Sequence, residues 1–96
     1  MDKSIIASEF SFKAVRSSGA GGQNVNKVSS KVVLTFDLVN SKGLTEEEKM
    51  LLQTKIATKL TQDGILILTS EEDRSQLKNK EKVIKKCFKL LENALV

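Results

Sequence analysis

Alternating apolar and polar positions predict two β-strands in the first forty residues of the chain. The first strand runs from Phe10 to Arg16, where Phe10, Phe12 and Ala14 fall on one face of a half-buried strand. The second runs from Lys31 to Leu38 and has a strongly apolar inner face, made of Val32, Leu34, Phe36 and Leu38. We expect the two strands to pair antiparallel, with the segment between them forming an oversized hairpin loop.

Turn and capping residues then predict a helix and a third strand. Thr45-Glu46-Glu47-Glu48 has the capping-box pattern that satisfies free amides at a helix start. Leu52, Ile56 and Leu60 follow at four-residue steps, and Gln62-Asp63-Gly64 is expected to end the helix. The next four residues, Ile65-Leu66-Ile67-Leu68, form a continuous apolar run typical of a strand buried on both faces.

A long amphipathic helix is predicted after Glu71-Glu72-Asp73. Its apolar stripe consists of Leu77, Ile84, Phe88, Leu91 and Leu95. A separate lysine stripe consists of Lys78, Lys82, Lys85 and Lys89. The order is therefore β-β-α-β-α, which predicts one small α+β domain over residues 1–96, with helices packed on a three-stranded sheet.

Composition restricts the possible chemistry. The 96 residues contain no histidine, and Cys87 is the single cysteine, which excludes an internal disulfide, a Cys/His zinc cluster and a nucleophile activated by histidine. We expect Cys87 to fill space in the core, beside the apolar stripe of the last helix. No apolar run approaches the ~20 residues of a membrane span, so a soluble intracellular protein is expected.

The net charge of +4 is unevenly distributed. Residues 44–73 carry three Lys/Arg and seven Asp/Glu, whereas residues 74–96 carry seven Lys/Arg and two Asp/Glu. Such a basic region is compatible with a polyanionic partner. The alternative is that the lysines only solvate one face of a helix.

A glycine-rich segment joins the two predicted strands. Gly19, Gly21 and Gly22 are three of the five glycines in the chain, and Gln23 follows directly. A Walker loop does not fit, because four residues separate Lys27 from Gly22, the last glycine of the segment, and a dinucleotide fingerprint would need glycine or alanine at Asn24. On spacing alone, the segment could also be a hairpin tip without chemistry.

The ten residues Ser18-Gly19-Ala20-Gly21-Gly22-Gln23-Asn24-Val25-Asn26-Lys27 resemble the GGQ loop of the prokaryotic-type peptide chain release factors. The resemblance extends to the following strand and, more weakly, to Arg74-Ser75-Gln76 with Asn79. The chain has no room for a codon-reading domain, so it most resembles the small codon-independent branch. Members of that branch are peptidyl-tRNA hydrolases that rescue stalled ribosomes.

This resemblance implies a specific chemistry for the segment. The reaction would be hydrolysis of the peptidyl-tRNA ester in the ribosomal peptidyl transferase centre, with Gly21, Gly22 and Gln23 as the catalytic residues. The two glycines would permit the backbone conformation, the Gln23 N–H would stabilise developing charge, and its side chain would place water. The resemblance implies no cofactor and no metal.

Further residues are assigned by the same resemblance as candidate RNA contacts. They are Arg16, Ser18, Asn26, Lys27 and Arg74. Each has an ordinary alternative: Asn26 could cap a turn, and Arg74 could pair with the acidic residues before it. The expected partners are ribosomal RNA and peptidyl-tRNA, with no membrane, and we expect a monomer in the bacterial cytoplasm or in an organelle matrix.

The family's small members continue into a Lys/Arg-rich tail, whereas the printed chain ends at Val96. We expect that the 96-residue chain is a shortened form from which such a tail was removed. The alternative is that this protein lacks the tail. Two other functions stay open. One is a non-catalytic module that binds RNA or the ribosome, and the other is a hydrolase that acts on free peptidyl-tRNA.

Overall fold

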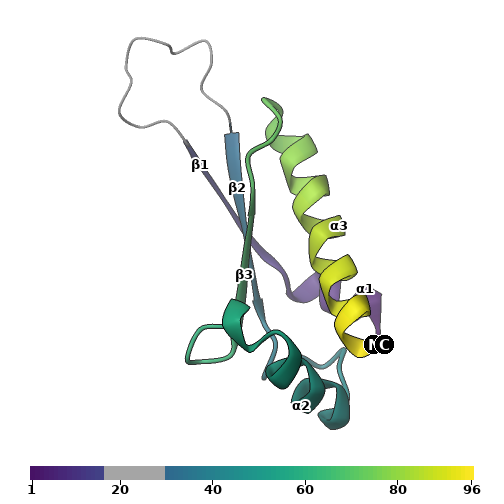
Figure 1. The fold of residues 1–96 in the computed structure, drawn as a ribbon. Coiled ribbons are helices and arrows are strands. Elements are labelled where there is room, and N and C mark those ends of the chain that lie inside the picture. Colours follow the sequence, from purple (N-terminus) through teal and green to yellow (C-terminus); the bar gives the residue numbers. More distant parts are fainter. Residues whose placement is uncertain (17–29) are drawn as a thin grey trace.

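The computed structural model describes residues 1–16 and 30–96, which form a three-stranded sheet with helices packed against it (Figure 1). In chain order the elements are α1 (Lys3–Glu9), β1 (Ser11–Arg16), β2 (Ser30–Asp37), α2 (Glu46–Lys55), the 3₁₀ turn η2 (Ala57–Lys59), β3 (Ile65–Ser70) and α3 (Gln76–Leu95). The sheet order is β1-β2-β3 with both pairings antiparallel, and α3 packs against β2 and β3. The predicted α+β class and the order of strands are confirmed.

The central strand β2 supplies the middle of the core. Val32, Leu34 and Phe36 alternate along it and are all buried, as the period of two predicts. They pack in one cluster with the buried side of α3, which includes Val83, Cys87, Leu91 and Ala94. The inner face expected for this strand is therefore confirmed.

Helix α1 was not expected from the sequence. Asp2 caps its start by accepting a hydrogen bond from the Ile5 backbone N–H at 3.2 Å. Ile6 is the one buried residue of its seven, so its sequence contains no apolar period to detect. Gly43 allows the close approach, because a Cβ there would lie 2.6 Å from Ile6 Cγ1.

Helix α2 begins as predicted but ends earlier. Both reciprocal hydrogen bonds of the Thr45 and Glu48 capping box are present. The helix stops at Lys55, because Ile56 has φ −119° and ψ 30°, and Leu60 then bridges to Leu66. Gly64 does have the expected positive φ, at 77°, but it serves the turn into β3 rather than the end of α2.

Strand β3 is an edge strand and is not buried on both faces. Leu66 and Leu68 face the core, whereas Ile67 between them is 46% exposed. The continuous apolar run hid this alternation, because Ile67 is apolar although it points away from the core. The expectation of a central or fully covered strand was wrong.

The buried side of α3 is also rotated from the predicted stripe. Its centre follows Val83, Cys87, Leu91 and Ala94, while Leu77 is 66% exposed and Ile84 and Phe88 are half-buried. At 100° per residue the two centres differ by about a quarter of a turn. The predicted stripe did not include Asn79 and Val83 and placed Cys87 beside it, whereas all three lie on the buried side.

Candidate functional site

The predicted site joins the paired ends of β1 and β2. β1 and β2 stay in register up to the Arg16 and Ser30 pair, between which residues 17–29 run. The predicted catalytic residues Gly21, Gly22 and Gln23 lie outside the described residues, as do the candidate RNA contacts Ser18, Asn26 and Lys27. The structure therefore gives the base of the site, where the Arg16 backbone is the last position of β1.

The start of α3 lies at the same end of the sheet as this base (Figure 1). Its position is set by Asn79, whose fully buried side chain holds the turn between β3 and α3. The Asp73 backbone N–H donates to Asn79 Oδ1 at 2.9 Å, and Asn79 Nδ2 donates to the Asp73 carbonyl at 2.8 Å. The Ser70 hydroxyl at the end of β3 also donates to Asn79 Oδ1, at 3.3 Å. One amide thus fixes the end of the strand, the turn and the helix start together.

Arg74 lies on this fixed turn and is exposed. Within residues 1–16 and 30–96 no ion pair joins Arg74 to the preceding acids, and Asp73 pairs with Lys82 at 3.9 Å instead. The Asp73 carboxylate also accepts from the Ser75 backbone N–H at 2.9 Å, and this hydrogen bond holds its pKa below the ordinary value. Arg74 is left facing solvent at the end of the molecule that carries the glycine-rich segment.

An apolar groove lies between β1 and the first turns of α3. It has a volume of about 420 Å³ and is lined by Phe12, Ala14, Val32, Gln76, Leu77 and Lys80. Phe12 is 36% exposed, and the Lys80 ammonium sits 4.7 Å from its ring centroid. The sequence pattern placed Phe12 on the same strand face as Phe10 and placed Leu77 on the buried stripe of the last helix, so it did not predict this groove.

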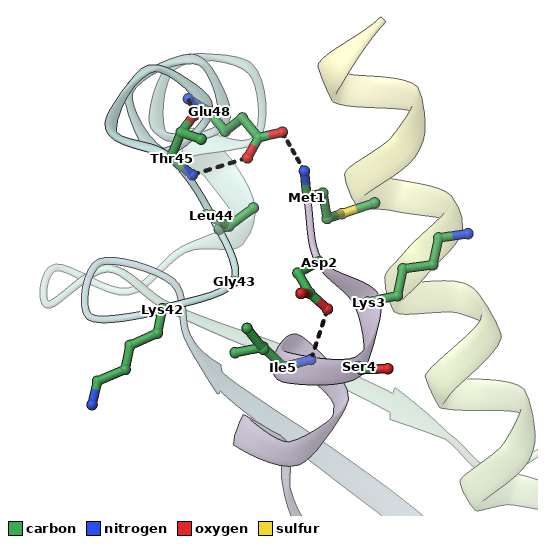
Figure 2. Close-up of a pocket in the computed structure, with 10 residues that line it drawn as sticks. All are labelled: Met1, Asp2, Lys3, Ser4, Ile5, Lys42, Gly43, Leu44, Thr45 and Glu48. Atoms are coloured by element: carbon green, nitrogen blue, oxygen red, sulfur yellow. Dashed lines mark hydrogen bonds and ion pairs between the residues drawn. The ribbon is translucent and has the colours of Figure 1, made fainter.

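A further cavity, of about 620 Å³, lies beside the chain's first residues and the start of α2, at the other end of the sheet. Figure 2 shows Glu48 reaching both the Met1 amine, at 2.8 Å, and the Thr45 backbone N–H, at 2.9 Å. The Met1 ammonium is the main cause of the lowered pKa of Glu48. These groups are occupied in joining the N-terminus to α2, and they lie far from the base of the glycine-rich segment.

The described residues offer few groups for self-contained catalysis. Cys87 is fully buried, and desolvation raises the pKa of its thiol to about 12, so it is an inert part of the core as predicted. Across residues 1–16 and 30–96, His, Cys, Asp and Glu side chains form no group of three or more that could hold a metal ion. None of the helices within those ranges is long and apolar enough to cross a membrane.

Comparison with known proteins identifies relatives over nearly the whole chain. The family model described as RF-1 domain matches residues 1–95. Peptidyl-tRNA hydrolase ArfB of Pseudomonas putida is 39% identical over 83 residues, which are 86% of this chain and 60% of that protein. Large ribosomal subunit protein mL62 of Mus musculus is 37% identical over 79 residues, which are 82% of this chain and 38% of that protein. The chain thus spans three fifths or less of the length of these relatives.

Proposed function

The chain belongs to the RF-1 domain family, and from this premise we propose that it hydrolyses peptidyl-tRNA on stalled ribosomes without reading a codon. The observation that carries the proposal is the Gly21-Gly22-Gln23 sequence, placed between two strands whose pairing continues to Arg16 and Ser30. The relative named peptidyl-tRNA hydrolase, 39% identical to this chain, supports the same activity.

In the proposed reaction, water attacks the carbonyl carbon of the ester that joins the peptide to the tRNA 3′ ribose. The tetrahedral intermediate collapses by breaking the bond to the 3′ oxygen, which takes up a proton. The products are a peptide with a free carboxylate and a tRNA with a 3′ hydroxyl. The Gln23 backbone N–H stabilises the developing negative charge, and the Gln23 side chain positions the water.

The proposed roles of Gln23, charge stabilisation and positioning of water, agree with the residues that the chain provides. The sequence has no histidine, and the Cys87 thiol is buried with a raised pKa of about 12. Positioning and a preorganised donor are therefore what the chain contributes, with the ribosome supplying the rest of the site. Arg16, Ser18, Asn26, Lys27 and Arg74 are the residues proposed to contact ribosomal RNA.

The proposed partners are the RNA of the peptidyl transferase centre and peptidyl-tRNA, and the protein acts as a monomer. The proposed location is the bacterial cytoplasm or an organelle matrix, and relatives from Pseudomonas putida and Mus musculus are compatible with either. Neither setting changes the chemistry proposed for Gln23.

The test is release of labelled peptide from stalled ribosomes by the wild type, Gln23→Ala and Gly22→Ala, each with a basic tail appended. We expect each substitution to slow release on the order of 100-fold: Gln23→Ala removes the side chain that positions the water, and Gly22→Ala displaces the backbone N–H donor of Gln23. Gln53→Ala is the matched control, because Gln53 is exposed on α2 at the other end of the sheet. Equal release by all four proteins would refute the catalytic proposal.

A second candidate function is a non-catalytic module that docks on the ribosome. The name of the relative mL62, a large ribosomal subunit protein, favours it. Under this function all four proteins bind ribosomes in a salt-sensitive way and none releases peptide. Release in the absence of ribosomes would instead indicate a hydrolase of free peptidyl-tRNA.

A further inference from the structure

We propose that a groove along α3 binds the phosphate backbone of ribosomal RNA. This lysine groove is lined by Ser70, Glu72, Lys82, Lys85, Lys86 and Lys89 and has a volume of about 360 Å³. The inference rests on the proposed function only in taking the ribosome as the partner. It assigns a binding surface to residues outside the glycine-rich segment.

The charges in the lysine groove are poorly compensated. Lys82 is 3.9 Å from Asp73, and Glu72 is the one acidic residue in the lining. Lys86 makes a long hydrogen bond of 3.4 Å to the Thr69 carbonyl, which leaves its charge without a counterion. No ion pair joins Lys85, Lys86 or Lys89 to another residue within the described ranges.

The spacing of these lysines argues against simple solvation of a helix face. Each lies three or four residues from another lysine of the groove, so that like charges are neighbours on the helix surface. Like-charge pairs at this spacing destabilise a helix, and Glu81, four residues before Lys85, makes no ion pair with it. A bound polyanion would relieve the repulsion of all four side chains together.

The position of the groove suits an extended strand of phosphates. From Lys82 to Lys89 the helix rises about 10 Å, at ~1.5 Å per residue. A nucleic-acid strand carries roughly one charge per 3.4 Å along its helix axis, so this length faces about three phosphates. The lysine ammonium is a point charge that binds phosphate without requiring a fixed base sequence.

The overall charge distribution gives this contact a direction. Ser70 ends β3 opposite Val32, near the start of β2, so the groove begins at the end of the sheet that carries the glycine-rich segment. Glu46, Glu47 and Glu48 form the acidic first turn of α2, which lies at the other end (Figure 1). A polyanion would be attracted to the lysine groove, where four lysines face one acidic residue, and repelled by the first turn of α2, which orients the molecule as the proposed function requires.

The experiment compares two variants that each lose three exposed lysines. The groove variant is Lys85→Gln, Lys86→Gln and Lys89→Gln, and the control variant is Lys42→Gln, Lys55→Gln and Lys59→Gln. Binding of the 96-residue chain to purified large ribosomal subunits and to protein-free large-subunit ribosomal RNA is measured from 50 to 200 mM KCl. Denaturation midpoints confirm that all proteins are folded.

We expect the groove variant to bind both probes at least about tenfold more weakly at 100 mM KCl, with a salt slope shallower by about 2, or roughly 0.7 per lost phosphate contact. The control variant should stay close to the wild type. The inference would be overturned if the groove variant bound as tightly as the wild type, or if both variants lost the same affinity. A loss on subunits but not on free RNA would assign the groove to an acidic ribosomal protein and overturn it as well.

Peptide release by Gln23→Ala separates this inference from the proposed function. If Gln23→Ala is inactive and the groove variant binds normally, the groove inference alone fails. If Gln23→Ala releases peptide normally, the catalytic proposal fails, whereas a weakened groove variant still supports the RNA contact.

Discussion

Asn79 and Asp73 hold each other by hydrogen bonds in both directions, although one lies in α3 and the other in the turn before it. The Asp73 backbone N–H donates to Asn79 Oδ1 at 2.9 Å, and Asn79 Nδ2 donates to the Asp73 carbonyl at 2.8 Å. A side-chain amide has the donor and the acceptor that a backbone peptide group needs. The pair therefore works as a clamp that sets where α3 begins relative to the sheet.

Replacing Asn79 by leucine keeps the volume but removes this clamp. We expect the free energy of unfolding to fall by about 1–3 kcal/mol, because backbone groups of Asp73 lose their partners. Urea denaturation measures the loss, and hydrogen exchange at the Asp73 amide should accelerate. Asn93→Leu is the matched control, since Asn93 is exposed on the same helix. A cost no greater than that of Asn93→Leu would contradict the clamp.

Glu48 gives the fold a specific acid sensitivity. Its two oxygens accept from the Met1 ammonium and the Thr45 backbone N–H, and its pKa is lowered from 4.5. A lowered pKa in the folded state stabilises the fold above the unfolded-state pKa, and this contribution is lost as pH falls through the folded-state pKa. The free energy of unfolding of the wild type should therefore decrease as the pH is lowered below about 4.5.

Glu48→Gln separates the ion pair from the capping box, because glutamine can still accept the Thr45 N–H. We expect a loss of up to about 1 kcal/mol at pH 7 and less dependence of the unfolding free energy on pH below 4.5. Glu46→Gln, at a carboxylate 89% exposed, is the control. An unchanged pH profile in Glu48→Gln would show that the Met1 contact contributes nothing.

Strong local patterns in the sequence predicted much of this fold. Val32, Leu34 and Phe36 revealed the central strand, and Thr45 with Glu48 revealed the start of α2. Both signals are local, since one depends on the period of the strand and the other on a reciprocal pair three residues apart. They needed no knowledge of what packs against them.

The predictions from sequence were wrong where tertiary contacts determine which residues are buried. Ile67 is apolar but exposed because it points to the face of the sheet opposite to α3, and Leu77 is exposed because the buried side of α3 is turned toward Val83 and Cys87. Helix α1 is held by contacts to Gly43, 34 or more positions away, which periodicity cannot detect. The candidate catalytic residues were found through resemblance alone, since Gly21, Gly22 and Gln23 have no local pattern that indicates chemistry.

Burial makes Cys87 a probe of unfolding. Its thiol is fully buried, and desolvation raises its pKa to about 12, so very little of it is ionised at pH 8. We expect alkylation by iodoacetamide in the native state to be on the order of a thousandfold slower than in 6–8 M urea, where the ordinary pKa near 8.5 returns. Mass spectrometry follows the reaction. Similar native and unfolded rates would mean that the thiol is accessible.

Leu77 and Leu91 provide a matched test of how α3 is oriented. Both are leucines on one helix and both belong to the predicted apolar stripe, but Leu77 is 66% exposed whereas Leu91 is fully buried. Leu91→Ala should lower the free energy of unfolding by about 2–5 kcal/mol, because it leaves a cavity against β2. Leu77→Ala should change it by less than about 0.5 kcal/mol, the range of ordinary surface substitutions. Urea denaturation of the two variants decides between the orientations, since the sequence stripe requires similar costs at both positions and the structure requires a difference of at least threefold.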